Sequence, residues 1–159
     1  MKKLSLALIL LLVPGFASAK DLTSRLGVGF RNAYSIELPS LAAVYYPSSE
    51  WGLVGALGVD TKDQNSSFAV SGGIRKIVFK EEHMNFFMGG VLSMISQESL
   101  GQTDSGFEMS GLVGSEFFLT GLDSLGFNVE SGIGVTNVRK VRFRTLGDHF
   151  LRAGIIFYF

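Results

Sequence analysis

Large hydrophobic residues recur at every second position in several segments of the chain. One face of the segment 106–119 carries Phe107, Met109, Val113 and Phe117. The opposite face carries small, polar or charged residues, namely Glu108, Ser110, Gly114 and Glu116. The segments 25–32, 67–79 and 125–137 alternate in the same way. A period of two residues predicts β-strands with one apolar face and one small or polar face.

Turn-forming residues divide most of the chain into segments of this kind. We predict eight strands, at residues 25–32, 41–46, 51–59, 67–79, 85–95, 106–119, 125–137 and 148–159. The connections between them tend to alternate between longer and shorter, and the longest predicted loops are 96–105 and 137–147. No change in composition divides the chain, so we expect one all-β, antiparallel domain.

The first 19 residues have the composition of a secretory signal peptide. Lys2 and Lys3 precede an apolar run at 4–13, and Ala17, Ser18 and Ala19 form a small-residue cleavage site. The apolar run is too short to span a bilayer as a helix. We therefore predict a removed signal peptide at 1–19 and a single barrel domain at 20–159 of an exported protein.

Composition and charge exclude several classes of function. The chain has no cysteine, so it forms neither disulfides nor thiolate metal sites. Without Lys2 and Lys3, 12 of the 14 basic residues remain against 14 acidic ones, which gives no electrostatic basis for binding nucleic acid. Hydrophobic residues make up 47% of the chain, and 20 glycines stand against 3 prolines. The chain is therefore rich in apolar residues, although no helix is predicted after the signal peptide.

The many strand glycines indicate which face of the sheet points inward. A soluble barrel places bulky apolar residues inside, whereas a membrane barrel turns them toward lipid and fills a narrow lumen with small and polar residues. The glycine-rich face fits a crowded lumen, so we predict an eight-stranded antiparallel up-and-down transmembrane β-barrel. A secreted lipocalin-like barrel that binds an apolar ligand is the alternative, and it requires the large residues to point inward.

The last eleven residues, HFLRAGIIFYF, carry the most specific pattern. Alternate hydrophobic positions run to the terminal phenylalanine, at Leu151, Ala153, Ile155, Phe157 and Phe159. In lipid an open sheet edge leaves backbone groups unpaired, so the last strand is expected to pair with the first. We also expect Phe157, Tyr158 and Phe159 to belong to an aromatic girdle at the membrane interface.

This pattern resembles the small eight-stranded outer-membrane barrels of Gram-negative bacteria, the group of the outer membrane protein A transmembrane domain and the X and W types. The resemblance implies a location in the outer membrane, in contact with lipid and lipopolysaccharide. It also implies that the five alternating tail residues are the signal read by the barrel-assembly machinery. We expect a monomer with a structural or interaction role at the cell surface.

Six charged residues fall on the predicted luminal face, namely Arg31, Arg75, Glu108, Glu116, Glu130 and Arg152. Buried charges must be paired, since an isolated one costs several kcal/mol. Eight strands leave little more room than side chains fill. We therefore expect a salt-bridge network that fills the lumen and leaves little or no open pore. A narrow channel for small solutes is the alternative.

The sequence offers no catalytic, metal or cofactor residue. His83 and His149 are the two histidines, and neither has the neighbouring serine of a lipid A deacylase. Asp60, Asp63 and Asn65 lack the glycine and terminal glutamate of a calcium loop. A lipid-modifying outer-membrane enzyme remains an alternative in principle, with the same fold.

One stretch concentrates positive charge, at Arg139, Lys140, Arg142 and Arg144. In the predicted topology it lies in the outer connection between the last two strands, at the level of lipopolysaccharide phosphates. Arginine binds phosphate through charge-assisted hydrogen bonds, so a lipopolysaccharide contact is one interpretation. An ordinary solvated hairpin is an equally good one.

Overall fold

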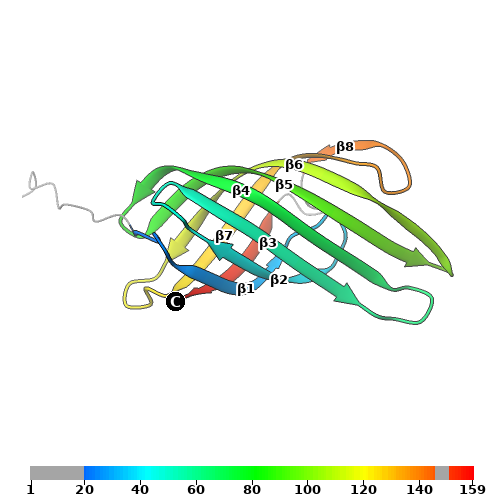
Figure 1. The fold of residues 1–159 in the computed structure, drawn as a ribbon, viewed down its shortest axis with the longest axis horizontal. Coiled ribbons are helices and arrows are strands. Elements are labelled where there is room, and N and C mark those ends of the chain that lie inside the picture. Colours follow the sequence, from blue (N-terminus) through cyan, green and yellow to red (C-terminus); the bar gives the residue numbers. More distant parts are fainter. Residues whose placement is uncertain (1–19, 146–150) are drawn as a thin grey trace, which may run out of the picture.

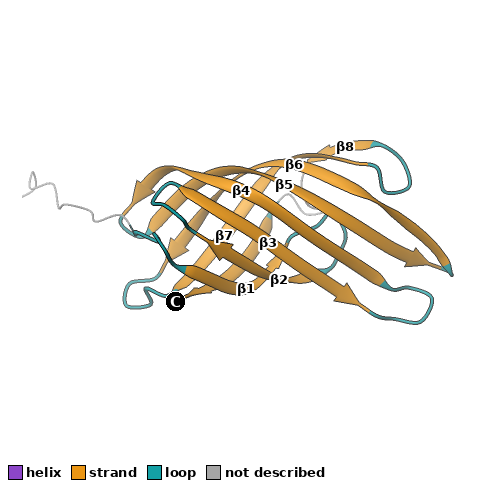
Figure 2. Cartoon of the chain, in the orientation of Figure 1, coloured by secondary structure: helices purple, strands orange, loops and turns teal. Residues whose placement is uncertain are grey.

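The computed structural model describes residues 20–145 and 151–159, and these form an all-β structure (Figure 1 and Figure 2). The strands are β1 Leu26–Asn32, β2 Pro39–Tyr45, β3 Trp51–Asp60, β4 Ser67–Glu81, β5 Met84–Ser99, β6 Gln102–Phe118, β7 Leu125–Thr136, β8 Arg142–Thr145 and β9 Arg152–Tyr158. The predicted signal peptide, the last two residues of the predicted loop 137–147, and residues 148–150 of the last predicted strand, which include His149, lie outside the described residues. Within that part of the chain, no helix is long and apolar enough to cross a membrane.

The sheet closes on itself. Each strand from β1 to β7 pairs with the next, β7 pairs with β9, and β9 pairs with β1, all antiparallel. The closure extends to Phe159. Its N–H donates to the Leu26 carbonyl at 2.9 Å, and its carbonyl accepts from the Leu26 N–H at 3.2 Å. The predicted closed, eight-stranded antiparallel barrel is confirmed.

Two strand segments share the eighth position. β9 pairs with the first half of β7, and β8 pairs with its last residues. Six residues, 146–151, separate β8 from β9, whereas only Ser131 and Gly132 separate their partners on β7. The prediction that 137–147 is entirely a loop is therefore wrong, because residues 142–145 pair in the sheet.

The prediction of a long loop at 96–105 is also wrong. β5 and β6 continue through it and meet at Leu100 and Gly101, whose φ angles of 53° and 75° form a tight two-residue turn. Polar residues in these strand ends hide the alternation, since neither face there is buried. The connections 82–83 and 100–101 both have two residues, so lengths do not alternate regularly around the barrel.

Both described ends of the chain lie at one end of the barrel, called here the terminal end (Figure 1). The connections 46–50, 82–83 and 119–124 lie at the same end. The connections 33–38, 61–66, 100–101 and 137–141 lie at the other, called here the mouth. An even number of strand positions places both described ends at the same end of the barrel.

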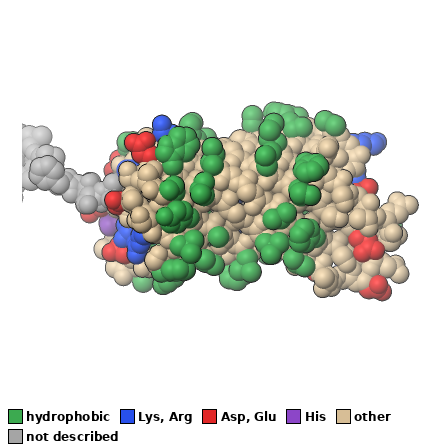
Figure 3. All heavy atoms as spheres, viewed as in Figure 1, with side chains coloured by type: hydrophobic (Ala, Val, Ile, Leu, Met, Phe, Trp, Pro, Cys, Tyr) green, Lys and Arg blue, Asp and Glu red, His purple; other side chains and the backbone are tan. Residues whose placement is uncertain are grey.

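The two faces of the sheet differ in the way that the alternation predicts. Phe30, Phe107 and Met109 are 60–66% exposed on the outer face, whereas inward-facing Glu108 and Glu116 are at most 1% exposed. Figure 3 shows hydrophobic side chains in two bands around the visible wall, with charged side chains at both ends. Large apolar side chains therefore cover the outside, whereas the inside holds buried charged and polar side chains together with a buried hydrophobic cluster.

Candidate functional site

The charged residues predicted on the luminal face all lie buried inside the barrel, and they form three ion pairs. Arg31 of β1 pairs with Glu130 of β7. Arg75 of β4 pairs with Glu116 of β6, and Arg152 of β9 pairs with Glu108 of β6, each with an N–O distance of 3.1 Å. The three positive and three negative charges balance, as low-dielectric surroundings require.

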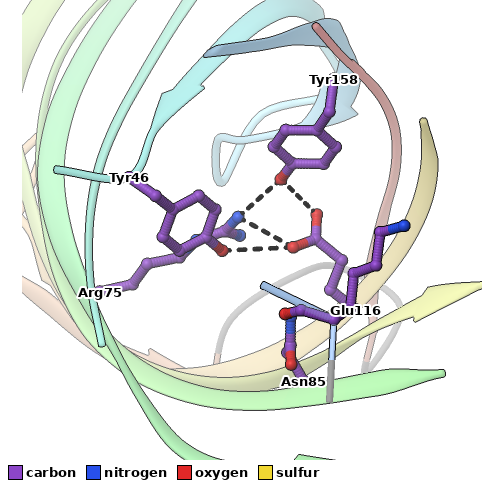
Figure 4. A network of polar contacts seen from close by, with 6 residues as sticks. Tyr46, Arg75, Asn85, Glu116 and Tyr158 are labelled. Atoms are coloured by element: carbon purple, nitrogen blue, oxygen red, sulfur yellow. Dashed lines mark hydrogen bonds and ion pairs between the residues drawn. The ribbon is translucent and has the colours of Figure 1, made fainter. Parts of the chain in front are cut away.

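Two tyrosines extend the pair nearest the terminal end into a network (Figure 4). The Tyr158 hydroxyl donates to one Glu116 oxygen at 2.7 Å, and the Tyr46 hydroxyl donates to the other at 3.2 Å. The Arg75 guanidinium donates to the Tyr158 hydroxyl at 3.0 Å and to Glu116. It also lies over the Tyr46 and Phe87 rings, at 4.9 and 4.7 Å from their centroids. We call these five residues the tyrosine network.

The prediction that Tyr158 belongs to an interfacial girdle is wrong. Its side chain is completely buried, while Phe157 and Phe159 on either side are 54% and 65% exposed. The two-residue alternation would have predicted a buried Tyr158, because Tyr158 lies on the same face of the last strand as the luminal Arg152. Sequence reasoning also missed Tyr46 and Phe87, both of which are buried in the lumen.

Inward-facing glycines provide the space that these large side chains occupy. A Cβ atom added at Gly52 would lie 2.9 Å from the Tyr46 ring. One added at Gly126 would lie 3.0 Å from the Glu116 carboxylate and 3.1 Å from the Tyr158 ring. The glycines therefore allow rings and charges from opposite walls to meet in a narrow lumen.

The pair nearest the mouth has fewer partners. Glu108 Oε2 and Arg152 Nε are buried and make no hydrogen bond to protein atoms. Two nitrogens of Arg75 also lack a hydrogen bond, but its guanidinium lies against two aromatic rings. The two ends of the lumen thus hold ion pairs of equal length in different surroundings.

The segment before β1 closes the lumen at the terminal end. Leu22 is 1% exposed and packs with the buried hydrophobic cluster that includes Tyr46 and Tyr158. The Asn85 side chain donates to the Lys20 carbonyl at 3.3 Å, and the Lys20 ammonium pairs with Asp123 at 3.0 Å. We call residues 20–22 the terminal cap.

The connection 33–38 closes the lumen at the mouth, and we call it the mouth cap. Tyr34 and Leu38 are each 3% exposed. The Tyr34 hydroxyl reaches the carbonyl oxygens of Ala56 and Ala69, at 2.6 and 3.0 Å. Burial raises the pKa of Tyr34 above its usual value, since the neutral phenol is favoured away from water.

The structure divides the predicted basic cluster. Arg139, Arg142 and Arg144 line a cavity of about 400 Å³ at the mouth, whose lining does not include Lys140. Phe143, between the last two, is 70% exposed and lines an apolar groove on the outer wall. Arg139 also pairs with Asp104, and Arg144 donates to the Ser35 carbonyl at 3.3 Å. Arg142 and Arg144 therefore lie at the barrel mouth, on the side of β8 away from the apolar outer wall.

The remaining sequence candidates among the described residues lie on the surface. His83 is exposed in a turn, 3.4 Å from the Thr120 hydroxyl and 3.8 Å from a Glu82 oxygen. Within residues 20–145 and 151–159, no three His, Asp or Glu side chains gather as a metal site. The five residues of the predicted assembly signal all point outward, four of them at 50% exposure or more: Leu151, Ala153, Ile155, Phe157 and Phe159.

Comparison with known proteins finds no match for this chain among protein-family models, curated proteins or solved structures.

Proposed function

We propose that the protein is an outer-membrane β-barrel of a Gram-negative envelope, exported by residues 1–19, with a structural or interaction role at the cell surface. The observation that carries the proposal is the inversion of polarity across the wall. Apolar side chains cover the outside, while six charged side chains are buried inside. A soluble ligand-binding barrel needs the reverse arrangement.

The outer surface has the dimensions and composition that a bilayer requires. The apolar positions of β6 extend from Phe107 to Phe117, eleven residues, which span ~25 Å at a rise of ~3.3 Å per residue and a tilt of ~40°. Exposed aromatic residues gather toward both edges of this region. Those toward the terminal end are Tyr45, Trp51, Phe79, Phe86, Phe117, Phe157 and Phe159, and those toward the mouth are Phe30, Phe68, Phe107 and Phe143. Two aromatic girdles are typical of membrane barrels.

The lumen supports a closed barrel in preference to a channel. The terminal cap and the mouth cap each bury an apolar side chain at one end, Leu22 and Leu38. Three ion pairs cross the space between them. In this proposal the outward alternation of the last strand is the assembly signal, and its physical role is to close the barrel edge.

A pair of matched substitutions tests the membrane proposal. Val113, near the middle of the apolar region of β6, and Leu100, at the β5–β6 turn, are 55% and 89% exposed. In a membrane, Val113→Arg costs ~2–4 kcal/mol of unfolding free energy, whereas Leu100→Arg, beyond the apolar region, changes it by less than about 0.5 kcal/mol. The measurement is urea unfolding in lipid vesicles, with the folded fraction read from the mobility of unheated against boiled samples on a gel.

In a water-soluble barrel both substitutions replace an exposed side chain, so neither would destabilise the fold appreciably. Equal, small effects of both variants would contradict the proposal. So would recovery of the wild-type protein in the soluble periplasmic fraction, without a change of gel mobility on boiling.

A further inference from the structure

Three glycines interrupt the rows of large apolar side chains on the outer wall. Gly72 of β4, Gly90 of β5 and Gly111 of β6 each lie between two exposed apolar residues in the outward alternation. A Cβ atom added at Gly72 or Gly111 would meet no neighbouring atom within 4 Å, and one added at Gly90 would meet only a backbone oxygen, at 3.7 Å. Unlike the luminal glycines, these three are therefore not required by packing within the barrel. Glycine in the middle of a strand is destabilising and often marks a place where another molecule approaches closely.

The three glycines form the floor of the outer apolar groove that Phe143 lines, which we call the wall groove. Two adjoining hollows of about 630 and 550 Å³ make up the groove, and they share Ile74, Gly90, Gly111 and Ile133. Large exposed side chains border it, among them Met88, Leu92, Met109 and Val113. Each volume falls in the range of ligand sites. The outer wall is thus hollowed where three neighbouring strands lack side chains.

Lys76 is the one charged residue in the described lining of the wall groove, and it lies at the groove's end nearest the terminal end of the barrel. Its cross-strand neighbour is Trp51, and its ammonium lies 5.6 Å from the centroid of the Trp51 ring. No Asp or Glu side chain of residues 20–145 and 151–159 forms an ion pair with Lys76. Lysine stems follow apolar surface while the ammonium reaches the membrane interface, where tryptophan also gathers. The groove therefore combines an apolar length with a cation at one end.

This combination matches an amphiphile with an anionic headgroup. From Lys76 to Gly72 the groove follows four residues of β4, which span ~13 Å at ~3.3 Å per residue. That length is close to half of the ~30 Å hydrocarbon core of a bilayer, so one extended acyl chain can lie along it from the interface toward the midplane. The Lys76 ammonium then meets the headgroup phosphate, with which it forms charge-assisted hydrogen bonds.

A second copy of the chain matches the groove less well. It would have to supply a counter-charge for Lys76, and no acidic side chain of the described residues faces outward between the two aromatic girdles. Within a bilayer, association of two apolar walls also lacks a hydrophobic driving force. A phospholipid supplies both the apolar chain and the negative charge.

We propose that the wall groove binds one glycerophospholipid, with its phosphate at Lys76 and one acyl chain along Gly72, Gly90 and Gly111. This inference rests on the proposed membrane location and deepens it, because it assigns one defined lipid site to a wall that otherwise contacts lipid unselectively. The headgroup lies toward the terminal end of the barrel.

The first experiment is native mass spectrometry of the folded mature protein in non-ionic detergent with phosphatidylglycerol added. Wild type retains one phospholipid per barrel. Gly90→Leu with Gly111→Leu fills the floor of the groove and lowers the retained fraction at least about fivefold, since the acyl chain loses its close contacts. The control, Ala43→Leu with Ala153→Leu, enlarges two outward side chains outside the wall groove and changes retention by less than about twofold.

The second experiment tests the headgroup. Wild type retains diacylglycerol with the same acyl chains several-fold less than phosphatidylglycerol, because diacylglycerol lacks the phosphate. Lys76→Gln removes most of this preference, whereas the control Lys80→Gln, on the same strand but outside the lining, keeps it. Both lysine variants leave the floor of the groove unchanged, so the proposal stays testable if the double leucine variant fails to fold.

Unchanged retention of phosphatidylglycerol in the folded double leucine variant would overturn the site, as would equal retention of both lipids by wild type. A wild-type dimer that the double leucine variant separates, with no bound phospholipid, would assign the wall groove to a second copy and overturn the proposal. A barrel that changes gel mobility on boiling but retains no phospholipid contradicts this inference alone. Recovery of wild type in the soluble periplasmic fraction contradicts the membrane location itself.

Discussion

The two ends of the lumen hold ion pairs that look alike by distance but differ in their surroundings. Arg75–Glu116 and Arg152–Glu108 have the same N–O distance of 3.1 Å, and all four side chains are at most 3% exposed. Glu116 also accepts hydrogen bonds from Tyr46 and Tyr158, whereas one oxygen of Glu108 has no protein partner. The comparison indicates that the groups around a buried pair, more than the pair itself, decide how strongly the fold depends on it.

The largest expected effect comes from removing one charge of the tyrosine network. Arg75→Met leaves the Glu116 carboxylate buried without its counter-ion and should cost ~3–5 kcal/mol of unfolding free energy. Arg152→Met should cost ~3 kcal/mol, at the low end of this range, because Arg152 donates to Glu108, whereas Arg75 also donates to Tyr158 and lies over two aromatic rings. Urea unfolding in vesicles, followed by gel mobility, measures both. Equal losses of unfolding free energy in Arg75→Met and Arg152→Met would contradict the idea that the surroundings of a buried ion pair decide its effect on stability.

An intermediate effect is expected from the two tyrosine hydroxyls. Tyr158→Phe removes the 2.7 Å bond to Glu116 and the 3.0 Å bond from Arg75, and should cost ~1.5–3 kcal/mol. Tyr46→Phe removes one 3.2 Å bond and should cost ~1 kcal/mol. The rings remain in both variants, so the same unfolding assay isolates the hydroxyl groups. If Tyr46→Phe lost more unfolding free energy than Tyr158→Phe, the number and length of the hydrogen bonds would not explain how much each hydroxyl contributes to stability.

The smallest effect is expected when both charges near the mouth are replaced together. Glu108→Leu with Arg152→Met leaves no unpaired charge, and apolar side chains of similar volume often substitute for a buried pair at little cost. The double variant should therefore lie within ~1 kcal/mol of wild type, closer than Arg152→Met alone. A double variant less stable than Arg152→Met would indicate that the Glu108–Arg152 pair makes a net contribution to folding.

Local pattern was sufficient for most of the strand content. The alternation in β1, β4, β6 and β7 was strong because one face is apolar and the other is not. It failed in the ends of β5 and β6 and in β8, where Arg142 and Arg144 read as loop residues. The ends of β5 and β6 extend beyond the apolar wall, and pairing with a neighbour keeps them extended without a hydrophobic face. In β8 the single residue on the apolar wall, Phe143, is too little to show an alternation.

The candidate sites were predicted in part. The six luminal charges could be placed on one face from period alone, but which arginine pairs with which glutamate depends on the closure and stagger of the barrel. Glu116 illustrates this, since it lies two strands from Arg75 in the sheet. Tyr158 was assigned to the wrong side because its residue type, typical of an interface, was given more weight than its position in the alternation.

The sequence by itself determined the two faces of the wall and the closed eight-position sheet, because a period of two and the spacing of turns are local properties of the chain. The tertiary structure decided what occupies the inside, namely the partners of each charge and the two caps. These bring together side chains far apart in the chain, such as Ser35 and Arg144, whose distance is set only when the last strand pairs with the first.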